Sequence, residues 1–118
     1  MPETRSIEDA KLFSSEGMQR VVLLESERLL VELLCLEPGQ AESLHTHHDA
    51  DAVYHVLEGC GRFRIGGEMA TGGAGTVLLA PAGMEHAAQN AAPERLVLLA
   101  AHARQLAPGE ERTSPCGG

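Results

Sequence analysis

The sequence predicts an all-β domain, either a sandwich or a barrel. Short runs rich in Val and Leu alternate with clusters of glycine, proline and polar residues, a spacing typical of such folds. The 13 glycines suit a chain with many tight turns. Hydrophobic residues make up 43% of the 118 residues but aromatic residues only 3%, so we expect one core of Leu, Val, Ala and Met side chains.

The expected strands follow one another with short connections. Pro38-Gly39 and Gly66-Gly67 are the clearest turn signals between them. Pro81 cannot donate a hydrogen bond to a sheet, so it belongs at the start of a strand or at a bulge. We expect strands at 19–25, 28–36, 52–58, 62–65, 68–70, 76–80, 85–89 and 95–101.

Residues 21–36 also allow a helical interpretation, because Leu and Glu are good helix formers and a Pro-Gly pair follows the run. Against this, Val21, Val22 and Val31 are β-branched and favour extended structure. Ser26 also interrupts the apolar run. We therefore predict two strands here, joined by a turn near Ser26.

The two ends of the chain differ from the middle. Residues 1–16 are charged and weakly patterned, and we expect a short arm or an edge strand there. The folded domain is expected at 17–107, and the Pro- and Gly-rich segment 108–118 is expected to be a disordered tail.

The first residues contain no apolar signal core, and three cysteines without a C-x-x-C spacing suggest reduced thiols. Both features favour a cytoplasmic protein.

The charge of the chain argues against two classes of partner. The formal net charge is −8, with 17 acidic residues against 9 Lys and Arg. Such a chain repels nucleic acid and anionic membrane surfaces. No apolar run approaches the ~18 residues that a membrane-spanning helix needs. We therefore expect neither nucleic acid nor a membrane as partner.

Three histidines suggest a metal site. If the segment around His45 and His47 is extended, residues two apart point to the same face, so both imidazoles aim at one place. His86 lies far along the chain, in a segment with its own glycine and proline punctuation. We expect the fold to bring His86 to the H-x-H pair and close a site for a divalent metal.

Two spaced motifs surround these histidines. The first comprises Gly39, His45, His47 and Gly59, and the second comprises Gly75, Pro81, Gly83, His86 and Asn90. Together, in this order and spacing, they resemble the two sequence motifs of the cupin family. The resemblance covers 39–90 and plausible flanking strands, which is nearly the whole expected domain.

The resemblance implies a double-stranded β-helix, or jelly-roll, barrel with a metal near its centre. It implies as ligands the histidines His45, His47 and His86, together with a carboxylate from the first motif. It also implies a divalent transition metal such as Fe, Mn, Ni or Zn, a small-molecule ligand or substrate, and a homodimer.

The sequence departs from the family at the carboxylate. Counted back from Gly59, the family's glutamate falls on Ala52, which cannot bind a metal. Counted forward from the histidine pair, it falls on Asp51. Either a bulge brings Asp51 to the metal, or the site has no carboxylate. We favour the register in which Ala52, Tyr54 and Val56 face inward and Asp51 faces outward.

Inward-facing side chains should line a pocket beside the metal. An aliphatic lining would suit a small, mostly apolar ligand. The candidates are Tyr54, Phe63, Ile65, Leu78 and Met84.

Two functions fit the sequence. The first is a metal-dependent oxygenase acting on a small molecule, in which three neutral histidines hold the metal, as in some cupin-type dioxygenases. The second is a non-catalytic module that binds or senses a small molecule, with a structural metal or none. Fold alone does not decide between them. The sequence indicates neither the substrate, nor the metal, nor a catalytic residue.

Overall fold

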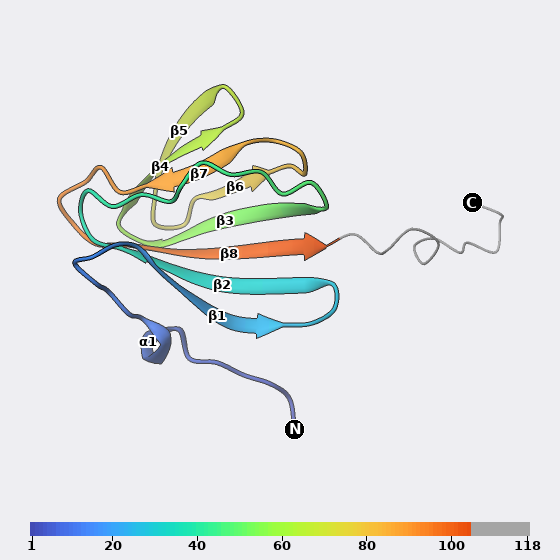
Figure 1. Ribbon diagram of the computed structural model, residues 1–118. Helices are drawn as coiled ribbons and strands as arrows, with labels where there is room; N and C mark the ends of the chain where they lie inside the picture. The colour runs from blue at the N-terminus through green and yellow to red at the C-terminus, as the bar shows by residue number, and fades with distance from the viewer. Residues whose placement is uncertain (105–118) are drawn as a thin grey trace.

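The computed structural model describes residues 1–104, which form two antiparallel sheets facing each other (Figure 1). The larger sheet has the strand order β1-β2-β8-β3-β6, and the smaller has the order β5-β4-β7. The prediction of an all-β fold is confirmed. The strands are β1 (Gln19–Glu25), β2 (Leu29–Leu36), β3 (Ala50–Glu58), β4 (Cys60–Ile65), β5 (Glu68–Gly73), β6 (Val77–Ala80), β7 (His86–Gln89) and β8 (Leu96–Arg104).

The alternation of β3 shows why its sequence forms a strand. Ala52, Tyr54 and Val56 are at most 3% exposed, while the residues between them are less buried. This period of two places one set of side chains in the core and the other outside. The predicted inward register of β3 is therefore confirmed.

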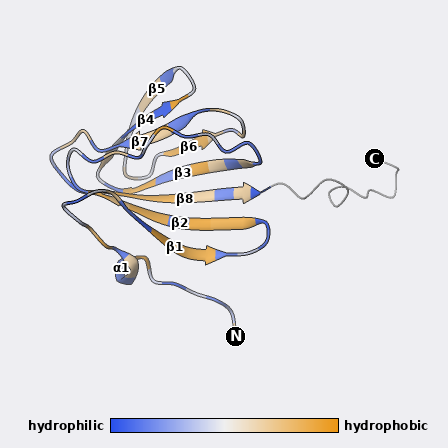
Figure 2. Cartoon of the chain, viewed as in Figure 1, coloured by the Kyte–Doolittle hydropathy of each residue, from blue (hydrophilic) through white to orange (hydrophobic). Residues whose placement is uncertain are grey.

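Residues 21–36 form parts of the strands β1 and β2 and no helix, as predicted. They pair antiparallel across a turn, and Ser26 closes that turn by accepting hydrogen bonds from the Arg28 and Leu29 amides. Both strands are largely hydrophobic (Figure 2), and β2 is covered on both of its faces along most of its length. On the outer face, the N-terminal segment packs Phe13 against the cluster that contains Leu33 and Cys35.

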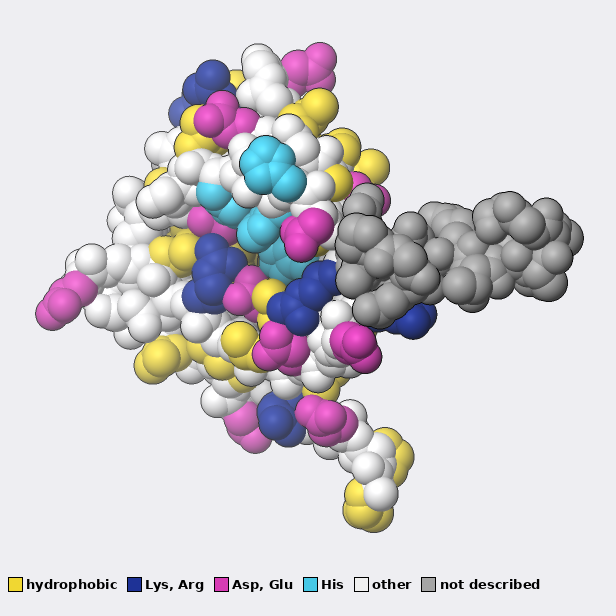
Figure 3. Space-filling view, turned by 45° about the vertical axis from the view of Figure 1, so that its right-hand side comes forward, with side chains coloured by type: hydrophobic (Ala, Val, Ile, Leu, Met, Phe, Trp, Pro, Cys, Tyr) yellow, Lys and Arg dark blue, Asp and Glu magenta, His cyan; other side chains and the backbone are white. Residues whose placement is uncertain are grey.

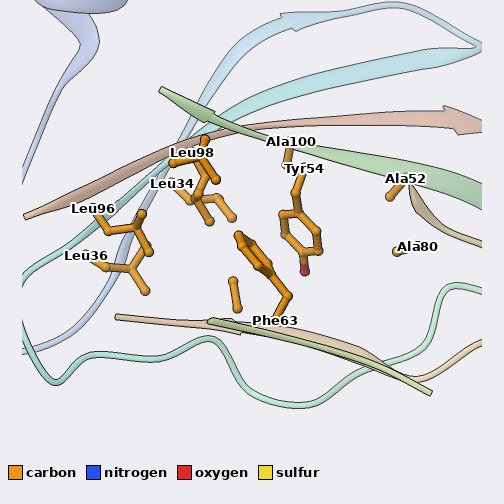
Figure 4. Close-up of a cluster of buried hydrophobic side chains, with 11 residues drawn as sticks. Leu34, Leu36, Ala52, Tyr54, Phe63, Ala80, Leu96, Leu98 and Ala100 are labelled. Carbon is orange, nitrogen blue, oxygen red and sulfur yellow. The ribbon is translucent and has the colours of Figure 1, made fainter. Parts of the chain in front are cut away.

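The main core fills the space between the two sheets (Figure 4). Phe63 from the smaller sheet stands beside Tyr54 from the larger one, with ring centroids 5.2 Å apart. Leu, Val and Ala side chains supply the rest, as the composition predicted, but the predicted contribution of Met is limited to Met18, which packs against this core while partly buried. The buried members are Leu34, Leu36, Ala52, Tyr54, Val56, Phe63, Ala80, Ala88, Leu96, Leu98 and Ala100.

Several boundaries differ from the prediction. Residues 1–16 contain a four-residue helix, α1 (Ile7–Ala10), capped by the Ser6 side chain, and no strand. β5 continues to Gly73, where we expected a loop, because it pairs with β4 along its whole length. No helix in residues 1–104 has the length and apolar character needed to cross a membrane. The predicted tail, 108–118, and the end of the predicted domain at 107 lie outside the described residues.

Two turn glycines provide a matched test of the fold. Both Gly59 and Gly75 adopt positive φ, at 84° and 93°. A Cβ at Gly59 would overlap the Arg95 carbonyl oxygen and lie 3.1 Å from the Leu96 Cα, whereas a Cβ at Gly75 would meet open space. Gly59 thus lets β3 pass closely by the segment that enters β8.

We therefore expect different costs for the same substitution. Gly75→Ala should lower the free energy of unfolding by about 1–2 kcal/mol, the cost of a left-handed conformation with a side chain. Gly59→Ala adds backbone overlap and should cost about 1–3 kcal/mol more. Urea denaturation of both variants measures the difference. Equal losses would contradict the close contact between Gly59 and Arg95.

Candidate metal centre

Backbone pairing brings the two histidine segments together. The His45 amide donates to the His86 carbonyl at 3.0 Å, and the His86 amide donates back to the His45 carbonyl at 2.8 Å. The Gly83 amide donates to the His47 carbonyl at 2.7 Å. The first segment makes only isolated bridges to β7 and is no continuous strand. These contacts fix both segments at one end of the space between the sheets.

The three predicted histidines meet at this place. One ring nitrogen from each of His45, His47 and His86 lies within 4.8 Å of the other two, and within residues 1–104 this is the one such group of three or more donors. Their ring centroids are 4.3 to 5.4 Å apart. Histidine side chains gather in the middle of one face of the molecule, so solvent reaches part of the group (Figure 3). The predicted association of His86 with the H-x-H pair is confirmed.

Backbone carbonyls orient two of the rings. Nδ1 of His45 lies 2.7 Å from the Ser43 carbonyl oxygen, and Nδ1 of His86 lies 2.9 Å from the Met84 carbonyl oxygen. A carbonyl accepts only, so each Nδ1 carries the proton and donates it, leaving Nε2 with a free lone pair. Histidines that bind metals are commonly held by such a hydrogen bond from the other nitrogen.

The Nε2 atom of His86 provides the test of whether a metal fits. It is buried and has no hydrogen-bond partner. A buried polar atom without a partner is costly, so it calls for an explanation such as an ion. Three neutral imidazole donors suit Zn, Cu, Fe or Ni ions. The residues present therefore fit a bound divalent transition metal.

The electrostatics keep two of these rings neutral. Burial lowers the pKa of His47, and the neighbouring histidines add to this effect. Burial also lowers the pKa of His86, outweighing the hydrogen bond to the Met84 carbonyl. A neutral imidazole is the form that binds a metal, so the site is ready to accept one at neutral pH.

The structure does not bring Asp51 to the three histidines. Asp51 is exposed on β3, and its Oδ1 accepts a hydrogen bond from the Ala82 amide at 2.8 Å. The pairing of β3 with β8 is regular from Ala50 to Val56, so no bulge turns Asp51 inward. Ala52 takes the inward position and offers no ligand atom. The three-histidine group therefore contains no carboxylate.

The predicted pocket residues occupy three different environments. Tyr54 and Phe63 are buried in the core, and Ile65 and Leu78 pack against that core while partly buried. Met84 is 40% exposed. Tyr54 comes closest to the site, with its ring centroid 6.0 Å from that of His86. Tyr54 is therefore the predicted pocket residue next to the histidines, whereas Phe63, Ile65 and Leu78 belong to or flank the core and Met84 is exposed.

The structure also has a pocket with a volume of about 270 Å³ that other residues line. None of the predicted pocket residues lines it. It is lined by Cys60, Gly61, Arg62, Thr71, Ala91 and Ala92.

A polar network below the histidines was not predicted from the sequence. It links Arg20 of β1 to two buried carboxylates, Glu32 and Glu42, at 2.8 Å each. Nε2 of His102 lies 3.2 Å from Glu32 Oε1, and the His102 ring centroid is 5.0 Å from that of His47. One signal for this network was available: Glu32 is a lone acid within an apolar run.

Comparison with known proteins identifies the family. The family model described as "Cupin domain" matches residues 32–102 of this chain. The chain belongs to the cupin family. No curated protein matches it.

Solved structures agree with this assignment of a cupin fold. The protein TT1209 from Thermus thermophilus is 33% identical, with a TM-score of 0.84, and the match covers 89% of this chain and 100% of that one. A protein with a double-stranded β-helix domain from Klebsiella pneumoniae is 25% identical, with a TM-score of 0.82, covering 88% and 91%. A protein from Thermotoga maritima described as a predicted oxalate decarboxylase is 27% identical, with a TM-score of 0.70, covering 74% and 80%. The expected double-stranded β-helix of this cupin is confirmed.

The lowered pKa values of His47 and His86 predict how the stability of the metal-free cupin changes with pH. Below the ordinary histidine pKa of 6.5, the unfolded chain binds protons that these two rings resist in the folded state. The free energy of unfolding should therefore be highest above about pH 6.5 and fall as the pH drops below it.

Urea unfolding with a chelator present, at about pH 7.5 and about pH 5.5, measures this effect within the titration range of histidine. The variant His47→Gln removes one of the two titrating rings, so its free energy of unfolding should decrease less between the two pH values than that of the wild type. A stability that is unchanged or greater at the lower pH would contradict the burial of these rings in neutral form.

Proposed function

We propose that this cupin binds one divalent transition metal through Nε2 of His45, His47 and His86 and is an oxygenase acting on a small molecule. The observation that carries the metal site is the buried Nε2 of His86, which lacks any partner and belongs to a group of three imidazoles. When bound, such a metal would supply coordination of substrate and dioxygen and transfer of electrons between them.

The protein's own residues prepare the site for this chemistry. The carbonyls of Ser43 and Met84 hold His45 and His86 with their Nε2 atoms free. Tyr54, whose ring centroid lies 6.0 Å from that of His86, and the neighbouring Phe63 are buried in the core beside the site. The His45 side chain is 27% exposed, so a small molecule can reach the site from outside.

The carboxylate near the histidines is already occupied by hydrogen bonds, and this favours chemistry at the metal over chemistry at a free acid. Both oxygens of Glu42 already accept hydrogen bonds, from Tyr54, Ala88 and Arg20. Among residues 1–104, the three-histidine group itself includes no acid. A reaction that requires a free protein carboxylate as general base is therefore poorly served here, whereas oxidation at a metal is not.

A non-catalytic binding module is the second candidate. The observation that favours it is the inward-facing Ala52, which stands where the resemblance placed a carboxylate ligand. A site without that carboxylate can hold a metal that serves only to bind a ligand. The two candidates share the metal and differ in turnover.

Homodimer formation and a cytoplasmic location stay predictions for this cupin. Exposed Val77 and Leu79 on the edge strand β6, at 61% and 57%, support the first. Light scattering of the purified protein measures its mass in solution.

Metal analysis of neighbouring variants tests the site. Wild-type protein reconstituted with Fe(II), Co(II) or Zn(II) should hold about one equivalent after desalting. His47→Ala should lose most of this metal because it removes one of three ligands. His48→Ala is the matched control, since His48 lies outside the group, and it should keep the wild-type content. Absence of metal from the reconstituted wild type would refute the proposed centre.

Turnover separates the two candidate functions. We expect the Fe(II)-loaded protein to consume dioxygen with at least one member of a panel of small thiols, diketones and phenols. Oxalate belongs in the same panel, with carbon dioxide release as the readout, because of the Thermotoga maritima relative. His47→Ala should be inactive throughout. A fully loaded wild type that turns over none of these compounds would favour the binding module.

A further inference from the structure

Two buried carboxylates belong to the polar network near the three histidines, and neither is a fixed position of the motifs that predicted the site. Glu32 comes from β2, and Glu42 comes from the segment that precedes the H-x-H pair; they are 5% and 7% exposed. Arg20 lies between them and donates to both at 2.8 Å. Its side chain is 35% exposed. The same guanidinium therefore serves two acids.

Glu42 is the acid that faces the ligand set. Its Oε1 accepts from the Tyr54 hydroxyl at 2.6 Å and from the Ala88 amide at 3.1 Å. Its Oε2 accepts from Arg20 and lies 3.8 Å from His45 Nε2, the nitrogen that is free to bind a metal. A carboxylate has about four acceptor positions, so Oε2 keeps one unused. Glu32 instead contacts His102.

The two buried carboxylates share one arginine. Both Glu32 and Glu42 accept hydrogen bonds from the Arg20 guanidinium. Burial raises the pKa of Glu32, but His102 and Arg20 outweigh burial and keep this pKa below its ordinary value, so Glu32 is ionised. Excess negative charge in a buried region is unfavourable unless a positive charge compensates it.

The inward position of β3 offers no negative charge to compensate a bound metal. Ala52 is 3% exposed and faces the interior, and Asp51 faces outward. A divalent cation held by three neutral imidazoles would keep its full charge within the ligand set. A carboxylate just below those ligands would stabilise it strongly, because the local dielectric is low.

We propose that Glu42 supplies the negative charge that compensates the metal at this centre. It comes from the segment before the H-x-H pair and takes the place of the acid that Ala52 cannot provide. This inference rests on the proposed metal site. Glu42 acts through its charge on the cation held by His45 and its partners. A role confined to hydrogen bonding with Tyr54 and Ala88 would need the shape of the side chain but not its charge.

Two substitutions at Glu42 separate charge from shape. Glu42→Gln keeps the shape and removes the charge, whereas Glu42→Asp keeps the charge and shortens the side chain. The readout is the dissociation constant for Co(II), measured by competition with a chelator on the full-length protein. We expect Glu42→Gln to weaken Co(II) binding by roughly 10–100-fold, the usual effect of residues that support metal ligands. Glu42→Asp should weaken it less.

Glu32→Gln is the matched control. It also removes one negative charge that pairs with Arg20, but Glu32 does not face a ligand nitrogen. It should change Co(II) affinity clearly less than Glu42→Gln does. Equal losses in Glu42→Gln and Glu32→Gln, or a larger loss in Glu42→Asp than in Glu42→Gln, would overturn the proposal.

Arg20→Gln gives an independent test with the opposite sign. Removing the guanidinium leaves the charge of Glu42 unneutralised, so Co(II) should bind more tightly than to wild type. Damage to the fold would weaken binding instead, and weaker binding to Arg20→Gln would overturn the proposal even if Glu42→Gln does not fold. Failure of the wild type to bind Co(II) would refute the metal centre itself. Wild-type binding with unchanged affinity in Glu42→Gln would refute only the role of Glu42.

Discussion

The candidate site depends on one pair of backbone hydrogen bonds. The reciprocal bonds between His45 and His86 join two segments that are about forty residues apart in the sequence. Because they involve the main chain, the separation of the two segments is set by the fold and not by side-chain rotamers. The resulting position buries Nε2 of His86 without a partner and brings it close to the other two rings. Everything proposed about metal binding follows from this arrangement.

A second constraint lies directly below the ligands, in the polar network around Glu42. Burial, together with the neighbouring Glu42 carboxylate, raises the pKa of Tyr54, so its hydroxyl remains a donor. That hydroxyl, the Ala88 amide and Arg20 hold Glu42 in place. A network with its partners satisfied is rigid and fixes the orientation of its members. The floor of the site is thus built from charged groups set into an otherwise apolar core.

The strands and the pair His45 and His47 could be predicted because both depend on local rules. The alternation over 52–58 predicted that Tyr54 and Val56 face inward, and the turn glycines indicated where strands end. His45 and His47 share a face through the period of two, and the cupin resemblance added His86. The same register placed Asp51 outward, as the structure shows.

Glu32 was the one local signal of the polar network, and the other contacts could not be predicted because they depend on approaches between distant strands. Arg20, Glu42 and His102 belong to three segments that meet only in the folded domain. Nothing in the local pattern distinguishes Glu42 from an exposed acid in a loop. The short bridges at 41 and 45 turn it inward, and they too depend on pairing with β7.

Anomalous diffraction from crystals of the Co(II)-loaded protein would locate the bound metal. A metal held by the three histidines should give one strong peak at about 2.1 Å from Nε2 of each of His45, His47 and His86. Nδ1 of His45 and His86 should still face the carbonyls of Ser43 and Met84. A peak elsewhere in the molecule, or none between the three rings at full occupancy of Co(II) in solution, would contradict the proposed centre.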